Sequence, residues 1–259
     1  MQIVTFDALG AEVKGYIHDD YDTLAAHKVR PAMLICPGGA YRWRSPREKD
    51  PVALRFSAMG YNTFIVEYSC GALASGYRPL RELAAAVRAV RARAEEWHID
   101  RNQVAVLGFS AGGHLACSLG TLWDDPVLAL GADARPDALI LCYPVITTGE
   151  FAHRESADWV SGGDPELREK LSLETRVGPG MPPTFVWHCT ADASVPVENT
   201  LLLVNAMQRA KVPYECHLFA GGAHGISMCT QEVETPYPDI APWADLCATW
   251  LNTLFHFIP

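Results

Sequence analysis

Residues 104–119 read VAVLGFSAGGHLACSL and combine three features in one short stretch. An apolar run at residues 104–107 is followed by Gly108-Phe109-Ser110-Ala111-Gly112 and then by a helix-favouring segment. A serine between two glycines, at a tight turn from a strand into a helix, is the context of a nucleophile elbow. The glycines let the chain turn sharply, and the turn would present the Ser110 hydroxyl at the positive end of the following helix. The stretch therefore predicts an α/β fold with Ser110 as a nucleophile.

Composition restricts the class of protein and the partners. The chain has 259 residues, of which 49% are hydrophobic and 20% charged, a composition typical of one large α/β domain. The formal net charge of −9 disfavours nucleic acid and anionic membranes as partners. No stretch approaches a membrane span, and residues 1–7 show neither the basic start nor the apolar core of a signal peptide. We therefore expect a cytoplasmic protein whose partner is neither nucleic acid nor a membrane.

The eight cysteines are dispersed and form no C-x-x-C pair. Several fall inside apolar runs, where a free cysteine behaves as a small hydrophobic residue. Their distribution predicts reduced, structural thiols, which agrees with a cytoplasmic location. The spacing offers no cluster of metal ligands, so we expect no metal site, and the serine chemistry considered below needs no organic cofactor.

Apolar runs alternate with helical patterns along most of the chain. Strands that are apolar almost throughout, separated by helices, indicate a mostly parallel sheet with helices on both faces. The expected parallel strands are residues 32–36, 62–68, 104–107, 138–143, 184–188 and 214–219. The expected helices are residues 50–59, 79 to about 97, the segment after Ser110, about 199–210 and about 241–255. The first thirty residues are expected to add antiparallel edge strands.

No linker, repeat or low-complexity segment divides the chain, so residues 1–259 are interpreted as one domain. Residues 147–183 are rich in glycine, proline and charge and lack a clear core pattern. They are a candidate lid or substrate-binding insertion, and a long surface loop with a short helix is equally compatible. The apolar residues 251–259 are compatible with core packing or with a contact in a homo-oligomer.

Two downstream loops supply a base and an acid for Ser110. A serine hydroxyl needs a base within hydrogen-bond reach, and that base needs an orienting carboxylate. Asp192 follows the expected strand 184–188, and His224, flanked by glycines, follows the expected strand 214–219. The order serine, acid, histidine brings all three to the carboxyl edge of an α/β sheet. We therefore predict Ser110, Asp192 and His224 as a catalytic triad.

Other histidines and aspartates are weaker candidates. His114 lies four residues beyond Ser110, where packing or support of the site is the simpler role. His188 and His217 lie inside expected strands, which favours positions in the core or on a sheet face. A surface turn is the alternative for Asp192, because aspartate is common in turns. The weaker rivals for the acid are Asp158, Asp164 and Asp239.

The loop after residues 32–36 predicts donors for an oxyanion. It reads Pro37-Gly38-Gly39-Ala40-Tyr41, which allows backbone N–H groups to approach a substrate closely. We predict that the N–H groups of Gly39, Ala40 and Ala111 form an oxyanion hole, which stabilises the tetrahedral intermediate. Two glycines after a strand are also compatible with a simple tight turn.

These segments together resemble the α/β-hydrolase superfamily, in particular the esterases related to hormone-sensitive lipase. The nearest resemblance is to bacterial acetyl xylan esterases and xylanase B-like esterases. Lipase relatives usually carry His-Gly-Gly-Gly at the oxyanion loop, where this chain has Pro37 and Ala40. Pro37 fits the xylan-esterase-like branch, and the methyl group of Ala40 would narrow the acyl pocket. The matching segments are CPGGAY (36–41), GFSAGGH (108–114), DASVPVEN (192–199) and GAHG (222–225).

The resemblance implies a serine carboxylesterase that hydrolyses short acyl esters, with O-acetyl groups on xylo-oligosaccharides or related carbohydrates as the substrate class. Tyr41 and Trp43 are then candidate substrate-binding residues, although Trp43 could equally pack on the surface. Arylformamidases, amidases and small peptidases share this fold and stay alternatives, because the pocket and not the fold decides the substrate. A non-catalytic hydrolase-fold protein that binds a ligand is the alternative of another class.

Overall fold

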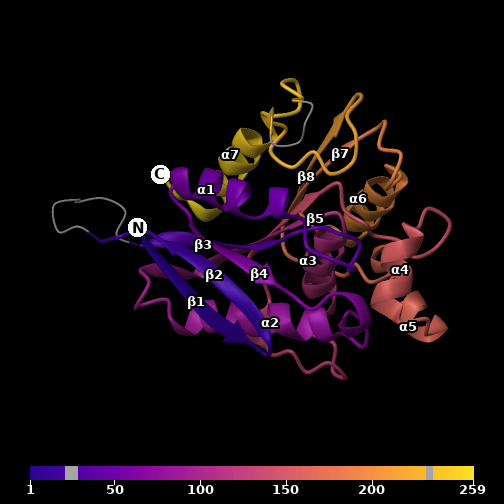
Figure 1. The fold of residues 1–259 in the computed structure, drawn as a ribbon, viewed down its shortest axis with the longest axis horizontal. Coiled ribbons are helices and arrows are strands. Elements are labelled where there is room, and N and C mark those ends of the chain that lie inside the picture. The colour runs from indigo at the N-terminus through magenta and orange to yellow at the C-terminus, as the bar shows by residue number, and fades with distance from the viewer. Residues whose placement is uncertain (21–28, 232–235) are drawn as a thin grey trace.

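The computed structural model describes residues 1–20, 29–231 and 236–259, and its centre is one eight-stranded sheet (Figure 1). The strand order is β1-β2-β4-β3-β5-β6-β7-β8, and β3 to β8 run parallel. β2 pairs antiparallel with both β1 and β4. This confirms the predicted mostly parallel sheet with an antiparallel N-terminal edge, although the part of that expectation on residues 21–28 lies outside the described residues. The strands are β1 (Gln2–Ala8), β2 (Ala11–Ile17), β3 (Arg30–Cys36), β4 (Asn62–Glu67), β5 (Ile99–Phe109), β6 (Ala138–Cys142), β7 (Thr184–Cys189) and β8 (Tyr214–Phe219).

Helices cover both faces of the sheet, as its apolar central strands require. Because side chains alternate along a strand, Leu34 of β3 points into one buried cluster while Met33 and Ile35 point into the other. One cluster includes residues of α1 and α7, and the other includes residues of α2, α3 and α6. Figure 1 shows α1 and α7 on one side of the sheet and α2 on the opposite side. The helices are α1 (Asp50–Ala58), α2 (Arg78–Ala92), α3 (Ala111–Leu122), α4 (Arg154–Ser161), α5 (Pro165–Lys170), α6 (Glu198–Ala210) and α7 (Trp243–Phe255).

The expected helix from residue 79 to about 97 is shorter in the structure, because α2 ends at Ala92. Trp97 lies beyond this end, where its ring packs 5.6 Å from that of Phe6 and 5.3 Å from that of Phe64. Its side chain belongs to the same buried cluster as the apolar face of α2. The helical spacing of apolar residues therefore continued past the last helical residue.

Residues 147–183 connect β6 to β7 and contain two helices, α4 and α5, and the 3₁₀ turn η4 (Leu173–Thr175). His153 caps the start of α4 by accepting a hydrogen bond from the Ser156 N–H, and Asp164 caps α5 in the same way. This segment therefore has more regular structure than a loop with one short helix. At the C-terminus Leu251, Phe255 and Phe257 are buried in the core, which accounts for most of that apolar stretch.

Candidate active site

Ser110 occupies the sharp turn between β5 and α3. Its backbone has φ 52° and ψ −117°, a strained combination for a residue with a side chain. Neighbouring strands hold this turn in place, since the Ser110 N–H donates to the Cys142 carbonyl (3.0 Å) and the Val145 N–H donates to the Ser110 carbonyl (3.1 Å). The strain and its support agree with the elbow expected from the sequence.

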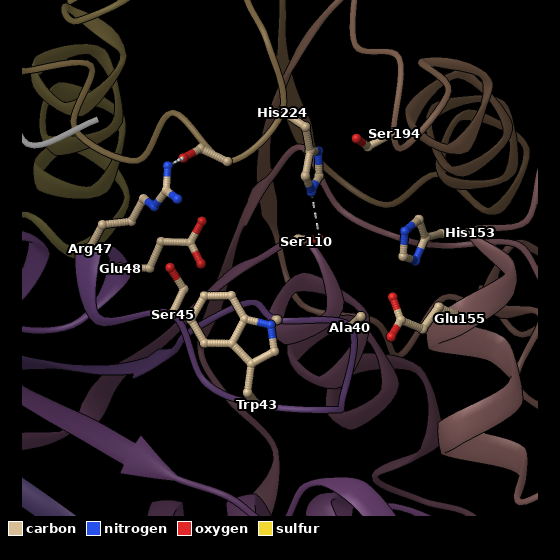
Figure 2. Close-up of a pocket in the computed structure, with 12 residues that line it drawn as sticks. Ala40, Trp43, Ser45, Arg47, Glu48, Ser110, His153, Glu155, Ser194 and His224 are labelled. Carbon is tan, nitrogen blue, oxygen red and sulfur yellow. Dashed lines mark hydrogen bonds between the residues drawn. The ribbon is translucent and has the colours of Figure 1, made fainter. Parts of the chain in front are cut away.

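The loops after β7 and β8 bring Asp192 and His224 to this turn. His224 Nε2 lies 2.8 Å from Ser110 Oγ, as the dashed line in Figure 2 shows, and His224 Nδ1 lies 2.7 Å from Asp192 Oδ2. Because a carboxylate only accepts hydrogen bonds, Nδ1 carries the proton, and Nε2 is free to accept the Ser110 proton. The three predicted triad residues, 114 and 32 positions apart along the chain, thus form one hydrogen-bonded chain.

Asp192 is held as a charged acceptor. Its Oδ1 accepts hydrogen bonds from the N–H groups of Ser194 and Val195, each 2.9 Å long. Burial by itself would raise the pKa of Asp192, but hydrogen bonds from His188 and His224 outweigh it and hold this pKa well below its usual range. The carboxylate can therefore orient His224 and stabilise a positive charge on its ring.

His188 approaches the same carboxylate from the buried side. Its Nε2 lies 3.4 Å from Asp192 Oδ2 and 3.0 Å from the Val195 carbonyl, so Nε2 carries the proton. Its Nδ1 then accepts a hydrogen bond from the Thr200 hydroxyl, 2.7 Å away. The sequence predicts His188 in the core or on a sheet face, without a connection to the site. Its position four residues before Asp192 was the available signal.

The oxyanion loop lies against the nucleophile turn. A Cβ atom on Gly38 would come within 3.0 Å of Ser110 Cβ. Gly39 has φ 127°, and any side chain there would meet the Trp43 carbonyl oxygen at 2.3 Å. The loop is closed by the N–H groups of Arg42 and Trp43, which both donate to the Gly39 carbonyl.

In the described part of the chain, the N–H groups of Gly39, Ala40 and Ala111 have no protein acceptor. Ala40 adopts φ 57°, and Ala111 is the first residue of α3. Unpaired donors at a helix N-terminus and a loop beside a serine hydroxyl can bind an oxyanion. The structure thus brings the predicted oxyanion residues to the same place as Ser110.

The prediction that Tyr41 binds substrate is not supported. Tyr41 is only 1% exposed, and its ring, at a residue with φ 61°, packs edge-on against the rings of Tyr68 and His114. The hydroxyl lies 2.9 Å from His114 Nδ1, and the His114 Nε2–H donates to the Leu171 carbonyl at 2.9 Å. Tyr41 therefore supports the loop from below. His114 links this loop to the 147–183 segment, in line with the supporting role expected for it.

A small polar pocket of about 230 Å³ opens above Ser110. Figure 2 shows Ser45, Arg47 and Glu48 on one side of Ser110, and His153, Glu155 and Ser194 on the other. Trp43 also lines the pocket and is 50% exposed, so its ring is available to a ligand. Of these seven residues, only Trp43 was predicted from the sequence. The only signal in the sequence was their position: close along the chain to the oxyanion loop or to Asp192, or inside the 147–183 segment.

The 147–183 segment contributes His153 and Glu155 to this pocket. Both lie at the start of α4, and Arg42 of the oxyanion loop reaches across to Glu155 with an N–O distance of 3.3 Å. The segment therefore forms one wall of the pocket, and movement as a lid stays a prediction.

Within residues 1–20, 29–231 and 236–259, no group of three or more His, Cys, Asp or Glu side chains is arranged to hold a metal ion. No helix in these same ranges combines the length and apolar character needed to cross a membrane.

Comparison with family models gives a match to the prolyl oligopeptidase family over residues 68–249. Endo-1,4-beta-xylanase B of Butyrivibrio fibrisolvens is 35% identical over 227 residues, which cover 84% of this chain and 35% of that protein. The acetylxylan esterase of Xylanibacter ruminicola is 31% identical over 209 residues, covering 77% of this chain and 42% of that protein. The chain thus spans less than half the length of these two relatives.

Solved structures match over nearly the whole chain. The acetyl ester-xyloside bifunctional hydrolase of Caldicellulosiruptor lactoaceticus is 36% identical with a TM-score of 0.83, covering 96% of this chain and 89% of that one. A carboxylesterase of Lactobacillus plantarum is 28% identical with a TM-score of 0.90 and full coverage of both chains. The resemblance to α/β hydrolases and acetyl xylan esterases that the motifs indicated is therefore confirmed.

Proposed function

Because the chain belongs to the prolyl oligopeptidase family of α/β hydrolases, we propose that it is a serine carboxylesterase that removes short acyl groups from carbohydrates. The observation that carries this proposal is the hydrogen-bonded chain from Ser110 through His224 to Asp192, beside the unpaired N–H groups of Ala40 and Ala111. The proposed substrates are O-acetyl groups on xylo-oligosaccharides. Two proteins similar to this chain, an acetylxylan esterase and an acetyl ester-xyloside bifunctional hydrolase, support this choice by their names.

The geometry supports a two-step mechanism. His224 Nε2 takes the proton of Ser110 as its Oγ attacks the ester carbonyl, and Asp192 stabilises the imidazolium that forms. The N–H groups of Gly39, Ala40 and Ala111 bind the oxyanion of the tetrahedral intermediate. As the bond between the carbonyl carbon and the sugar oxygen breaks, His224 gives its proton to that oxygen, and the sugar leaves as an alcohol. Water, deprotonated by the same histidine, releases acetate from Ser110 and regenerates the enzyme.

The pocket supports a small acyl group and a hydroxylated alcohol. Its volume of about 230 Å³ lies below the roughly 300–1,000 Å³ of drug-sized pockets. Exposed Trp43 offers an aromatic face to a sugar ring, and His153 and Glu155 offer hydrogen-bonding groups to hydroxyls. The eight free cysteines favour a reducing compartment, so we place the reaction in the cytoplasm, on oligosaccharides already taken up.

Acetate release from acetylated xylo-oligosaccharides tests the proposal, with p-nitrophenyl acetate and butyrate, an N-formyl arylamine and a short peptide amide in parallel. We expect release from the sugar and the acetyl ester, weak turnover of butyrate and the amides, and loss of all activity in Ser110→Ala. Faster turnover of the formamide or peptide than of any ester would assign the site to amide hydrolysis, which the same geometry can perform.

A further inference from the structure

Glu48 is a buried acid beside Ser110 that the mechanism above does not use. It ends the short 3₁₀ turn η1 (Pro46–Glu48), only 2% of the residue is exposed, and its carboxylate points into the pocket in Figure 2. Among the residues that the structure describes, no basic side chain forms an ion pair with it. Burying a carboxylate without such a partner costs free energy, so other groups must stabilise it.

Both oxygens of Glu48 accept hydrogen bonds from the active-site loops. Oε2 accepts the Gly38 N–H at 2.7 Å, and Oε1 accepts the Tyr143 hydroxyl at 2.7 Å. The Tyr143 oxygen in turn accepts the Ser227 N–H at 2.9 Å. One continuous chain of hydrogen bonds therefore joins the oxyanion loop, the end of β6 and the loop that carries His224.

Each end of this chain lies next to a reacting group. Gly38 precedes two of the proposed oxyanion donors and approaches the Ser110 side chain closely. Ser227 lies three residues after His224, and the Tyr143 ring packs edge-on against the His224 ring with centroids 5.1 Å apart. A change at Glu48 would therefore move the oxyanion donors relative to His224.

Burial raises the pKa of Glu48 above its usual value, and the hydrogen bonds from Tyr143 and Gly38 and the nearby charges of His224 and Arg47 offset only part of this rise. The geometry nevertheless uses both oxygens as acceptors, one for each loop. A protonated carboxyl would lose one of its two acceptor positions, and Gly38 N–H or Tyr143 O–H would lose its partner.

We propose that Glu48 is a positioning residue that ties the oxyanion loop to the histidine loop through Gly38, Tyr143 and Ser227. This inference rests on the proposed function only in that Ser110 must be the nucleophile. It does not depend on which ester the enzyme uses in nature. Glu48 itself touches neither the substrate carbonyl nor the transferred proton. Its effect is on the position of donors that act only in the tetrahedral state.

The test compares Glu48→Gln with Glu82→Gln. Glu82 is the control, because it is also buried (1% exposed) and accepts a backbone N–H and a hydroxyl, both from Ser69; unlike Glu48 it also pairs with Arg78. It lies on α2 and does not line the pocket. Gln keeps the shape of Glu but has only one acceptor oxygen, so one of the two donors to residue 48 loses its partner.

The readouts are kcat and KM for p-nitrophenyl acetate, the rate of labelling by a fluorophosphonate, and inhibition by a boronic acid that forms a tetrahedral adduct. In Glu48→Gln we expect kcat to fall about 10- to 100-fold with KM within about threefold, because the lost interactions act on the transition state. Boronic-acid affinity should fall by a similar factor. In Glu82→Gln the melting temperature should fall while kcat stays within about twofold.

Tyr143→Phe provides a second variant that keeps the packed ring and removes only the hydroxyl link. We expect kcat to fall about 5- to 10-fold, and the double variant to lose little more than Glu48→Gln alone, because both changes break one chain. If Glu48→Gln does not fold, Tyr143→Phe still tests whether the hydrogen-bonded link affects kcat.

Equal losses of kcat in Glu48→Gln and Glu82→Gln would overturn the positioning role, as would a loss confined to KM or an unchanged kcat in Tyr143→Phe. Normal reaction with p-nitrophenyl acetate without release of acetate from sugars would contradict the proposed substrate alone. A wild-type protein inert to both the ester and the fluorophosphonate would overturn both proposals.

Discussion

The two halves of the pocket are built in different ways. Ser110, Asp192 and His224 each follow a parallel strand. Backbone hydrogen bonds to residues at the neighbouring strand end hold Ser110, and N–H groups two and three residues further along the chain hold the Asp192 carboxylate. The walls come instead from the loop after β3 and from the 147–183 segment, which are joined by such contacts as the exposed Arg42–Glu155 pair. Surface ion pairs of this kind contribute little stability, about 0–1 kcal/mol.

This difference separates chemistry from selectivity. A site held by strand ends is precise, because the backbone of a parallel sheet fixes the distances between its loops. A wall made from surface segments can change without disturbing the reacting atoms. Changes at the sheet edge should therefore abolish turnover of every ester. Changes to exposed wall side chains that do not hold the oxyanion donors, such as Trp43, should affect only substrates with a bulky alcohol.

Apart from removal of the nucleophile itself, the largest effect is expected at Asp192. Replacing it by Asn keeps the shape but removes the charge and favours the wrong tautomer of His224, so kcat should fall about 10³- to 10⁴-fold. Steady-state turnover of p-nitrophenyl acetate measures this. The matched control is Asp158→Asn, an exposed aspartate on α4 that pairs with Arg168. Similar activity of the two variants would mean that Asp192 does not orient the base.

A second prediction concerns His114 of α3, which joins the two segments of the wall through Tyr41 and Leu171. Burial lowers the pKa of His114 to about 4, so the folded protein keeps this ring neutral while the unfolded chain takes up a proton below about pH 6.5. The stabilisation is complete above pH 7 and is lost as the pH falls from about 6.5 to about 4. At pH 5 the free energy of unfolding should have dropped by about 2 kcal/mol from this group.

Urea unfolding of wild type and His114→Gln at pH 7.5 and pH 5 checks this expectation. The variant lacks the titrating ring, so its stability should fall less between the two pH values, even if it is less stable at both. His256→Gln removes an exposed histidine and should keep the wild-type pH dependence. Equal pH dependence in all three proteins would show that His114 does not couple protonation to folding.

The smallest effect is expected in the wall. Trp43→Ala removes the exposed ring beside Ser110, so KM for acetylated xylo-oligosaccharides should rise about tenfold, as for the loss of one stacked ring. The kcat and KM for p-nitrophenyl acetate should each change less than about twofold. Trp123→Ala, at a half-buried tryptophan outside the pocket, is the control. Equal losses for both substrates in Trp43→Ala would remove the distinction between wall and sheet edge.

The same division explains what could be predicted from sequence. Apolar runs predict the strands and their parallel arrangement. Polar residues directly after those runs predict that Ser110, Asp192 and His224 meet. These patterns are local in the sequence. Because the carboxyl ends of parallel strands meet at one edge of the sheet, they are enough to predict where the site lies. The prediction for α2 was too long because Trp97 continues the apolar spacing after the helix has ended.

The wall could not be predicted in the same way. Tyr41 and Trp43 lie two residues apart, yet the Tyr41 ring, at a residue with φ 61°, lies in the core while the other stays exposed. Glu48 contacts Tyr143, 95 residues away, through a buried hydrogen bond that no periodic pattern records. Such contacts depend on how loops from distant segments pack, which only the three-dimensional arrangement supplies.

Labelling with a fluorophosphonate, followed by peptide mapping, tests the central claim most directly. Ser45 and Ser194 also line the pocket, so Ser45→Ala and Ser194→Ala are matched controls for Ser110→Ala. We expect one label on Ser110 in the wild type and in both controls, and none in Ser110→Ala. A label that persists in Ser110→Ala, or that maps to Ser45 or Ser194, would contradict the assignment of Ser110 as the nucleophile.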